Sequence, residues 1–154
     1  LSTTSPLVPL VKGLKSTPLR IPITLESPKI GVIGEEMMFG IKREKNELIS
    51  ALRAALSEQG VEIVEGTNIG SDVLTLRVYA DTKVGGEGSG FYTAYLNATL
   101  ELLDTDNELV IQKNLERVKG VQLDKDRAGE EAYRKAVREI GGRFIEAFVK
   151  ALYQ

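Results

Sequence analysis

VLTLRVYADTKVGGEGSGFYTAYLNATLELLDTDNELVIQKNLERV, residues 73–118, decides the fold because apolar and polar side chains alternate along most of its length. From Tyr92 to Leu102 every second residue is apolar or aromatic. This period of two predicts strands with one face against a core and the other toward water. Turn signals at 85–90 (glycine-rich) and 104–107 (DTDN) divide the stretch, so we expect three antiparallel strands in a meander.

Helical periodicity appears on either side of this meander. Over residues 45–59 the apolar side chains form one stripe, and Gly60 follows where a helix usually ends. Over residues 124–152 apolar residues recur every four positions, a stripe wide enough to cover a sheet face. We expect the pair Gly141-Gly142 to kink this second helix or to mark the close approach of another backbone.

The N-terminal part of the chain has a different composition. All five prolines lie within the first 28 residues, and residues 1–18 contain no acid. Proline fits neither a helix interior nor a central ladder, so residues 1–18 are expected to form an extended Pro/Ser/Thr-rich linker or strap. Apolar alternation predicts an edge strand at 19–25, and β-like runs follow at 30–39 and 61–64. Residues 19–154 should then form a single domain, an ordinary length for one.

These elements predict the fold class. One amphipathic sheet face and two amphipathic helices can bury each other as two layers. We therefore expect an α+β two-layer sandwich, with a mostly antiparallel sheet (the meander) covered by two helices on one face. The longest apolar runs fall far short of the roughly 20 residues that a membrane-spanning helix needs.

The chain contains no histidine and no cysteine, which narrows its chemistry. The commonest general base near neutral pH, the commonest metal ligand and the thiolate nucleophile are missing. Carboxylates, lysines, tyrosines or hydroxyls would need strong pKa tuning to replace them. A net charge of −2 and a pI near 5.4 also disfavour nucleic acid as a partner. We therefore expect no catalytic residues, no cofactor and no metal site.

The glycine-rich segment is similar to a phosphate-binding loop, which needs its glycines between a strand and a helix N-terminus. Here strands are expected on both sides, and Glu87 would repel a phosphate. We expect a flexible hairpin tip instead, and its exposed position makes it a candidate protein-contact loop. The residues of this loop are Val84, Gly85, Gly86, Gly88, Gly90 and Phe91.

Two acidic clusters have structural explanations. Asp124 opens a segment similar to a calcium loop, but Ala128 stands where a ligand is required. Helix capping by Asp124 or Asp126 explains these acids better. Asp104 and Asp106 could pair as acid and base, but two solvated carboxylates also favour the tight turn in which they lie.

Four aromatic residues lie on the two strands beside the glycine loop. On an open sheet they could stack nucleic-acid bases. The acidic balance of the chain instead favours core packing for some of them and a protein-contact patch for the rest. They are Tyr79, Phe91, Tyr92 and Tyr95.

The stretch from Glu47 to Leu152 resembles small bacterial envelope lipoproteins. The segments concerned are NELISALRAALSEQGVEIVEG, SDVLTLRVYADTK, YTAYLNATLELLDTDNELVIQKNLERVKG and AYRKAVREIGGRFIEAFVKAL. Their order is similar to that of the YajG-type lipoproteins. It is more distantly similar to the periplasmic domains of the curli-secretion lipoprotein and of flagellar or peptidoglycan-synthesis accessory lipoproteins. Gly60, Asp72 and the turn at 102–110 match features of these families.

The resemblance implies a non-enzymatic protein that binds other envelope proteins, or copies of itself, as an assembly or accessory factor. It also implies a periplasmic location with a lipidated cysteine that tethers the protein to the outer membrane. That cysteine would have to precede Leu1, and residues 1–18 would suit the spacer. Two alternatives stay open. One is a carrier that holds a small apolar ligand or lipid between the sheet and the C-terminal helix; the other is a cytosolic enzyme that uses carboxylates or lysine.

Overall fold

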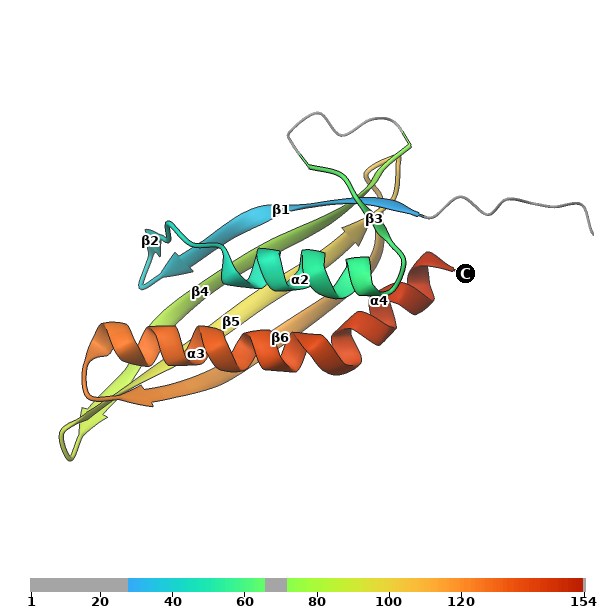
Figure 1. The fold of residues 1–154 in the computed structure, drawn as a ribbon. Helices are drawn as coiled ribbons and strands as arrows, with labels where there is room; N and C mark the ends of the chain where they lie inside the picture. The colour runs from blue at the N-terminus through green and yellow to red at the C-terminus, as the bar shows by residue number, and fades with distance from the viewer. Residues whose placement is uncertain (1–27, 66–71, 154) are drawn as a thin grey trace, which may run out of the picture.

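The computed structural model describes residues 28–65 and 72–153 of the chain (Figure 1). These residues form one sheet with helices packed on one of its faces, which is the expected α+β arrangement in two layers. The linker or strap at 1–18 and the edge strand at 19–25 lie outside the described residues and stay predictions.

The sheet of the described residues contains six strands in the order β2-β1-β4-β5-β6, with β3 also paired to β1. Strand β5 pairs antiparallel with β4 on one side and with β6 on the other, so the predicted meander is confirmed. β1 lies parallel to β4 and to β3, a pairing that alternation alone does not reveal. The strands are β1 (Lys29–Met38), β2 (Ile41–Lys42), β3 (Glu62–Ile63), β4 (Leu74–Gly88), β5 (Phe91–Leu103) and β6 (Leu109–Gln122).

The helical layer contains the two predicted helices, the second of which is interrupted. The first is α2 (Glu47–Glu58), and the second runs as α3 (Lys125–Glu139), a π-helical turn η1 (Ile140–Phe144) and α4 (Ile145–Leu152). Gly142 has φ −102° and ψ −118°, outside the helical range, so the kink lies at the predicted glycine pair. None of the described helices has the length and hydrophobicity that a membrane span requires.

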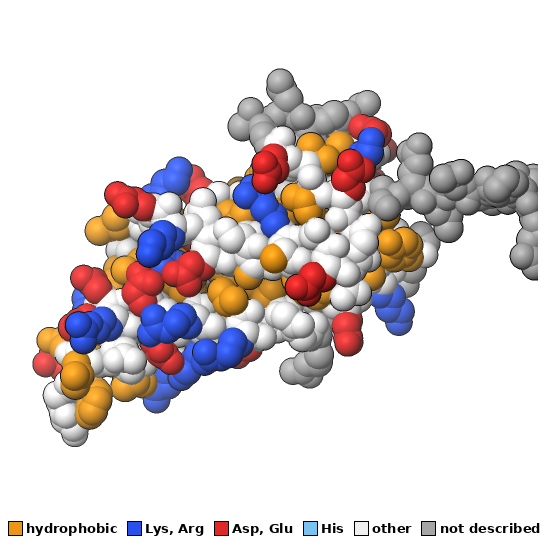
Figure 2. All heavy atoms as spheres, in the orientation of Figure 1, with side chains coloured by type: hydrophobic (Ala, Val, Ile, Leu, Met, Phe, Trp, Pro, Cys, Tyr) orange, Lys and Arg blue, Asp and Glu red, His pale blue; other side chains and the backbone are white. Residues whose placement is uncertain are grey.

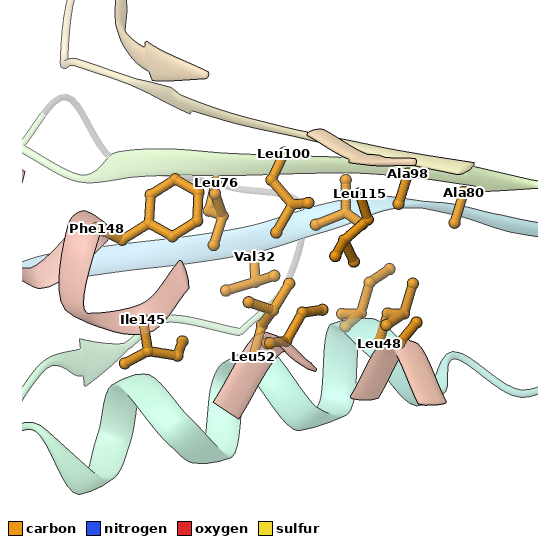
Figure 3. Close-up of a cluster of buried hydrophobic side chains, with 14 of the residues drawn as sticks. Val32, Leu48, Leu52, Leu76, Ala80, Ala98, Leu100, Leu115, Ile145 and Phe148 are labelled. Atoms are coloured by element: carbon orange, nitrogen blue, oxygen red, sulfur yellow. The ribbon is translucent and has the colours of Figure 1, made fainter. Parts of the chain in front are cut away.

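The core lies between the sheet and the helices (Figure 3). Leu76 and Leu100 from the sheet, Leu48 and Leu52 from α2, and Phe148 from α4 are all buried there. Each such side chain contributes about 1.5–3 kcal/mol by leaving water. The alternation seen in the sequence is therefore the alternation between this core and the helix-free face of the sheet.

Helix α3 approaches β6 very closely at Gly120. A Cβ atom at this position would lie 2.1 Å from the carbonyl oxygen of Ala128 and 2.6 Å from the backbone nitrogen of Ala132. Both neighbours are backbone atoms of a helix and cannot rotate away. Only a residue without a side chain therefore fits between the two layers here.

Substitution Gly120→Ala is expected to destabilise the fold by about 3 kcal/mol, at the upper end of overpacking costs, because the helix must move as a whole. The free energy of unfolding in urea measures the effect. Gly88→Ala is the matched control, since nothing lies within 4 Å of a Cβ there; it should change stability by less than about 0.5 kcal/mol. Equal effects of the two substitutions would contradict this account of the layer spacing.

Candidate functional site

The candidate protein-contact loop is a tight β-hairpin. β4 continues through Gly88 and β5 begins at Phe91, and these two residues still pair. The turn consists of Ser89 and Gly90, with φ of 54° and 81°, a combination that suits a two-residue hairpin turn. The expected loop over 85–90 was therefore wrong in extent, because glycines inside a strand give the same composition as glycines in a loop.

The end of this hairpin projects beyond the helices (Figure 1). It carries exposed apolar side chains. Val84 is 53% exposed and Phe91 is 47% exposed. Val121 near the end of β6 and Leu123 just after this strand are exposed as well. Figure 2 shows hydrophobic side chains gathered at this tip, at the lower left of the view. Binding of a protein here stays a prediction.

The helix-free face of the hairpin holds cations around Tyr95. Its neighbours in β5, Ala94 and Leu96, are fully buried toward the helices, so Tyr95 lies on the opposite face. Lys83 of β4 and Lys119 of β6 are the direct strand partners of Tyr95. Because both lysines are exposed, they add positive charge on either side of the ring.

A third cation reaches Tyr95 through a β-bulge. The register of β5 and β6 shifts between Leu96 and Ala98, and Arg117 in the bulge has φ 54°. The Arg117 N–H donates a hydrogen bond of 2.9 Å to Oδ1 of Asn97. The guanidinium then lies 4.3 Å from the centroid of the Tyr95 ring, a cation–π contact.

A glycine of β4 makes room for the same ring. A Cβ atom at Gly85 would lie 2.3 Å from Cε2 of Tyr95, so the ring packs directly on this part of β4. The predicted loop glycine therefore has a packing role within the hairpin. The cations of this face were missed in the sequence because they come from two strands, β4 and β6, that lie on either side of the strand of Tyr95.

The four aromatic residues are divided between the two faces of the sheet. Phe91 and Tyr95 share the helix-free face, and Tyr92, an odd number of residues away from each, lies on the other face. Tyr79 and Phe91 are exposed, whereas Tyr92 and Tyr95 are half-buried. The four side chains therefore do not form one continuous stacking surface.

The acidic candidates have the structural roles that were expected. Oδ1 of Asp104 accepts hydrogen bonds from the backbone N–H groups of Asp106 and Glu108, which closes the turn. Oδ1 of Asp124 accepts from the N–H of Arg127 and caps α3. Within residues 28–65 and 72–153, no three Asp or Glu side chains are arranged to hold a metal ion.

A buried carboxylate that the sequence did not reveal caps helix α2. Glu36 of β1 is fully buried, and its Oε1 and Oε2 accept hydrogen bonds from the N–H groups of Leu48 (3.0 Å) and Ile49 (2.9 Å). Asn46, the residue in the N-cap position, makes no side-chain cap. The carboxylate also meets the positive end of the helix dipole, so it fixes α2 to the sheet.

Arg43 connects this cap to helix α3. Its Nη2 donates hydrogen bonds to Oε1 of Glu47 (3.0 Å) and to Oε2 of Glu130 (2.9 Å). Its Nη1 lies 3.6 Å from Oε1 of Glu36, and its Cζ lies 3.9 Å above the centroid of the Tyr133 ring. Three carboxylates and one aromatic ring, from β1, α2 and α3, thus surround one guanidinium.

Burial governs the ionisation of this cluster. Burial raises the pKa of Glu36, although the N–H groups of α2 and the charge of Arg43 oppose the shift. Burial also opposes the charge of Arg43, but Glu47 and Glu130 outweigh it and raise the pKa of the guanidinium. Since Glu36 has no exposed surface, a substrate cannot reach it, and we interpret the cluster as the tie between layers rather than a reaction centre.

Substitution Arg43→Met should therefore destabilise the protein by about 3–5 kcal/mol, because it leaves Glu36 buried without its cation. Thermal and urea unfolding measure the loss. Arg77→Met is the matched control: Arg77 pairs with Glu101 at 3.1 Å, but its side chain is 37% exposed, so the pair is worth less than about 1 kcal/mol. A loss at Arg43 no larger than at Arg77 would refute the structural role.

Comparisons with known proteins show the fold and no closer relationship. No family model matches the chain, and no curated protein matches its sequence. A protein from Caulobacter crescentus CB15, provisionally classed as a lipoprotein, is similar with a TM-score of 0.50 at 15% identity over 79% of this chain and 90% of that one.

Two further solved structures are similar at lower scores. A protein from Helicobacter pylori, provisionally described as a homologue of the neuraminyllactose-binding haemagglutinin, has a TM-score of 0.49 at 14% identity over 78% of this chain and 87% of that one. A minor lipoprotein from Acinetobacter baumannii has a TM-score of 0.45 at 15% identity over 83% of this chain and 92% of that one. The chain therefore shares the fold of a protein classed among bacterial lipoproteins.

Proposed function

We propose that this chain is a non-enzymatic protein-binding domain of the bacterial cell envelope, acting as an assembly or accessory factor. The fold likeness to a bacterial lipoprotein supports the envelope setting. The contact surfaces described above support a binding role. The single observation that carries the proposal is the open edge of strand β6.

Strand β6 is long and, among the described residues, pairs with β5 alone. Its 14 residues present a row of backbone donors and acceptors along the other side. An extended segment of a partner can add to such an edge as a further strand. The charged side chains of Lys113, Glu116 and Arg117 on this strand would select a partner of complementary charge and discourage indiscriminate pairing.

The proposed partners are other envelope proteins or a second copy of this chain, and the hairpin residues 84–91 provide a second contact surface. The proposed location is the periplasm, with an upstream lipid anchor in the outer membrane. The carrier alternative receives less support, because Leu76, Leu100 and Phe148 are buried where the ligand would lie between the sheet and the terminal helix.

The edge contact can be tested with a unique thiol, since the chain has no cysteine of its own. Asn114→Cys on β6, labelled with a photoreactive maleimide in cells of the source species, should cross-link to an envelope protein or to the chain itself. Mass spectrometry identifies the adduct. Ser57→Cys, exposed on α2, is the control and should give no adduct. Equal adducts at both positions, or none at Asn114→Cys, would count against the edge.

The proposed anchor has a separate test. In the full-length reading frame we expect a cysteine before Leu1 that incorporates an alkyne-tagged fatty acid in growing cells. Replacing that cysteine with serine should release the protein from the membrane fraction into the periplasmic fraction. A cytosolic, unlabelled protein would contradict both the anchor and the periplasmic location.

A further inference from the structure

The strand register places apolar side chains and cations in sequence along the helix-free face of the hairpin. Phe91, Thr93 and Tyr95 occupy alternate positions of β5 and therefore share this face. Val121 lies opposite Thr93. At the tip, this row presents the exposed side chains of Phe91 and Val121.

The cations follow further along the same face. Lys83 and Lys119 lie on either side of Tyr95, and Arg117 stacks on its ring. We call these residues, defined by their shared face, the hairpin patch: Phe91, Thr93, Val121, Tyr95, Lys83, Lys119 and Arg117. Phe91 and Tyr95 are four residues apart, which separates the apolar tip from the cations by about 13 Å.

The acidic side chains near the hairpin reduce this charge but do not cancel it. Glu87 pairs with Tyr92, which lies on the other face. Asp81 shares the face of Lys83, but its Oδ1 already accepts hydrogen bonds from the N–H groups of Gly40 (3.1 Å) and Thr82 (2.8 Å). Glu116 lies beside Arg117 in the bulge, opposite Asn97. With Lys83, Lys119 and Arg117 against Asp81 and Glu116, the helix-free face of the hairpin keeps an excess of one positive charge in a protein of net charge −2.

We propose that the hairpin patch binds the surface of a membrane rich in anionic lipids. This proposal rests on the proposed function for one point, that the domain works beside an envelope membrane. It adds that the lipid surface is what the hairpin contacts there. The order of side chains matches the interface of a bilayer. Apolar residues enter some 5–10 Å past the headgroups, and Lys and Arg reach the phosphates behind them.

This order favours a lipid surface over a protein as the occupant. A hairpin end that projects from the body fits a broad, deformable surface. The apolar tip and the cations lie one behind the other along the strands, in the same order as the acyl chains and the phosphates of a bilayer. Each basic residue near an anionic surface is worth about 1 kcal/mol, a factor of about five in binding. The patch alone therefore gives weak, reversible binding, which would reinforce a lipid anchor as a second signal.

The test uses the purified chain and sedimentation with vesicles of equal parts phosphatidylglycerol and phosphatidylcholine. We expect binding to these vesicles at low salt, its loss at high salt, and no binding to pure phosphatidylcholine. The double variant Lys83→Gln/Lys119→Gln should lose about 25-fold in partitioning, from the factor of about five per cation. Phe91→Ser should weaken binding several-fold by removing apolar area from the tip.

The control variant is Lys45→Gln/Lys150→Gln, which changes the net charge equally at two exposed lysines outside the patch and outside the edge of β6. It should retain most of the binding, and circular dichroism checks that every variant is folded. Failure of the wild-type chain to bind the anionic vesicles, or an equal loss in the control, would overturn the proposal. So would a Gly88→Cys cross-link to an acidic envelope protein without vesicle binding. None of these outcomes bears on the edge of β6, which is tested by a different thiol in cells.

Discussion

The distance between the sheet and helix α3 is set by a backbone contact at Gly120. Because the residue has no side chain, helix α3 lies close to β6. The buried residues of α3 that face the sheet include Ala128, Ala132 and Ala136, whose small side chains allow the same close approach. At this short distance Tyr133 can donate its hydroxyl hydrogen bond to the carbonyl oxygen of Met37 in β1. The arginine-centred cluster depends on the same proximity, since one of its carboxylates projects from α3.

Local periodicity was sufficient to predict the elements that bury one face. The meander, helix α2 and the capping role of Asp124 all follow from patterns among residues that lie close together in the sequence. The parallel pairing of β1 with β4 did not follow, because it joins segments some 45 residues apart (Ile30 with Leu74). The cap from Glu36 and the cluster around Arg43 were missed for the same reason, since Arg43 and Glu130 are separated by 87 positions. No local pattern encodes such contacts.

In the part of the chain that the structure describes, two arginines stack on tyrosines, and their surroundings differ. Arg43 lies 3.9 Å from the Tyr133 centroid inside the fold, where three carboxylates neutralise it. Arg117 lies 4.3 Å from the Tyr95 centroid on an exposed bulge, beside two lysines. In the first arrangement, carboxylates within the fold compensate the charge of the arginine. The second leaves its charge exposed, which is why only the second belongs to the proposed binding surface.

The position of β1 in the sheet has a consequence for the order of folding. The three strands of the meander are joined by short turns, so their mutual contacts close small loops and form with little entropic cost. β1 joins β4 only after the segment between them, which includes α2, has been looped out. We expect β1 to dock late, with its buried glutamate arriving together with the helix that it caps. Until β1 docks, its own backbone groups and the edge of β4 that it covers would both be unpaired and open to other chains.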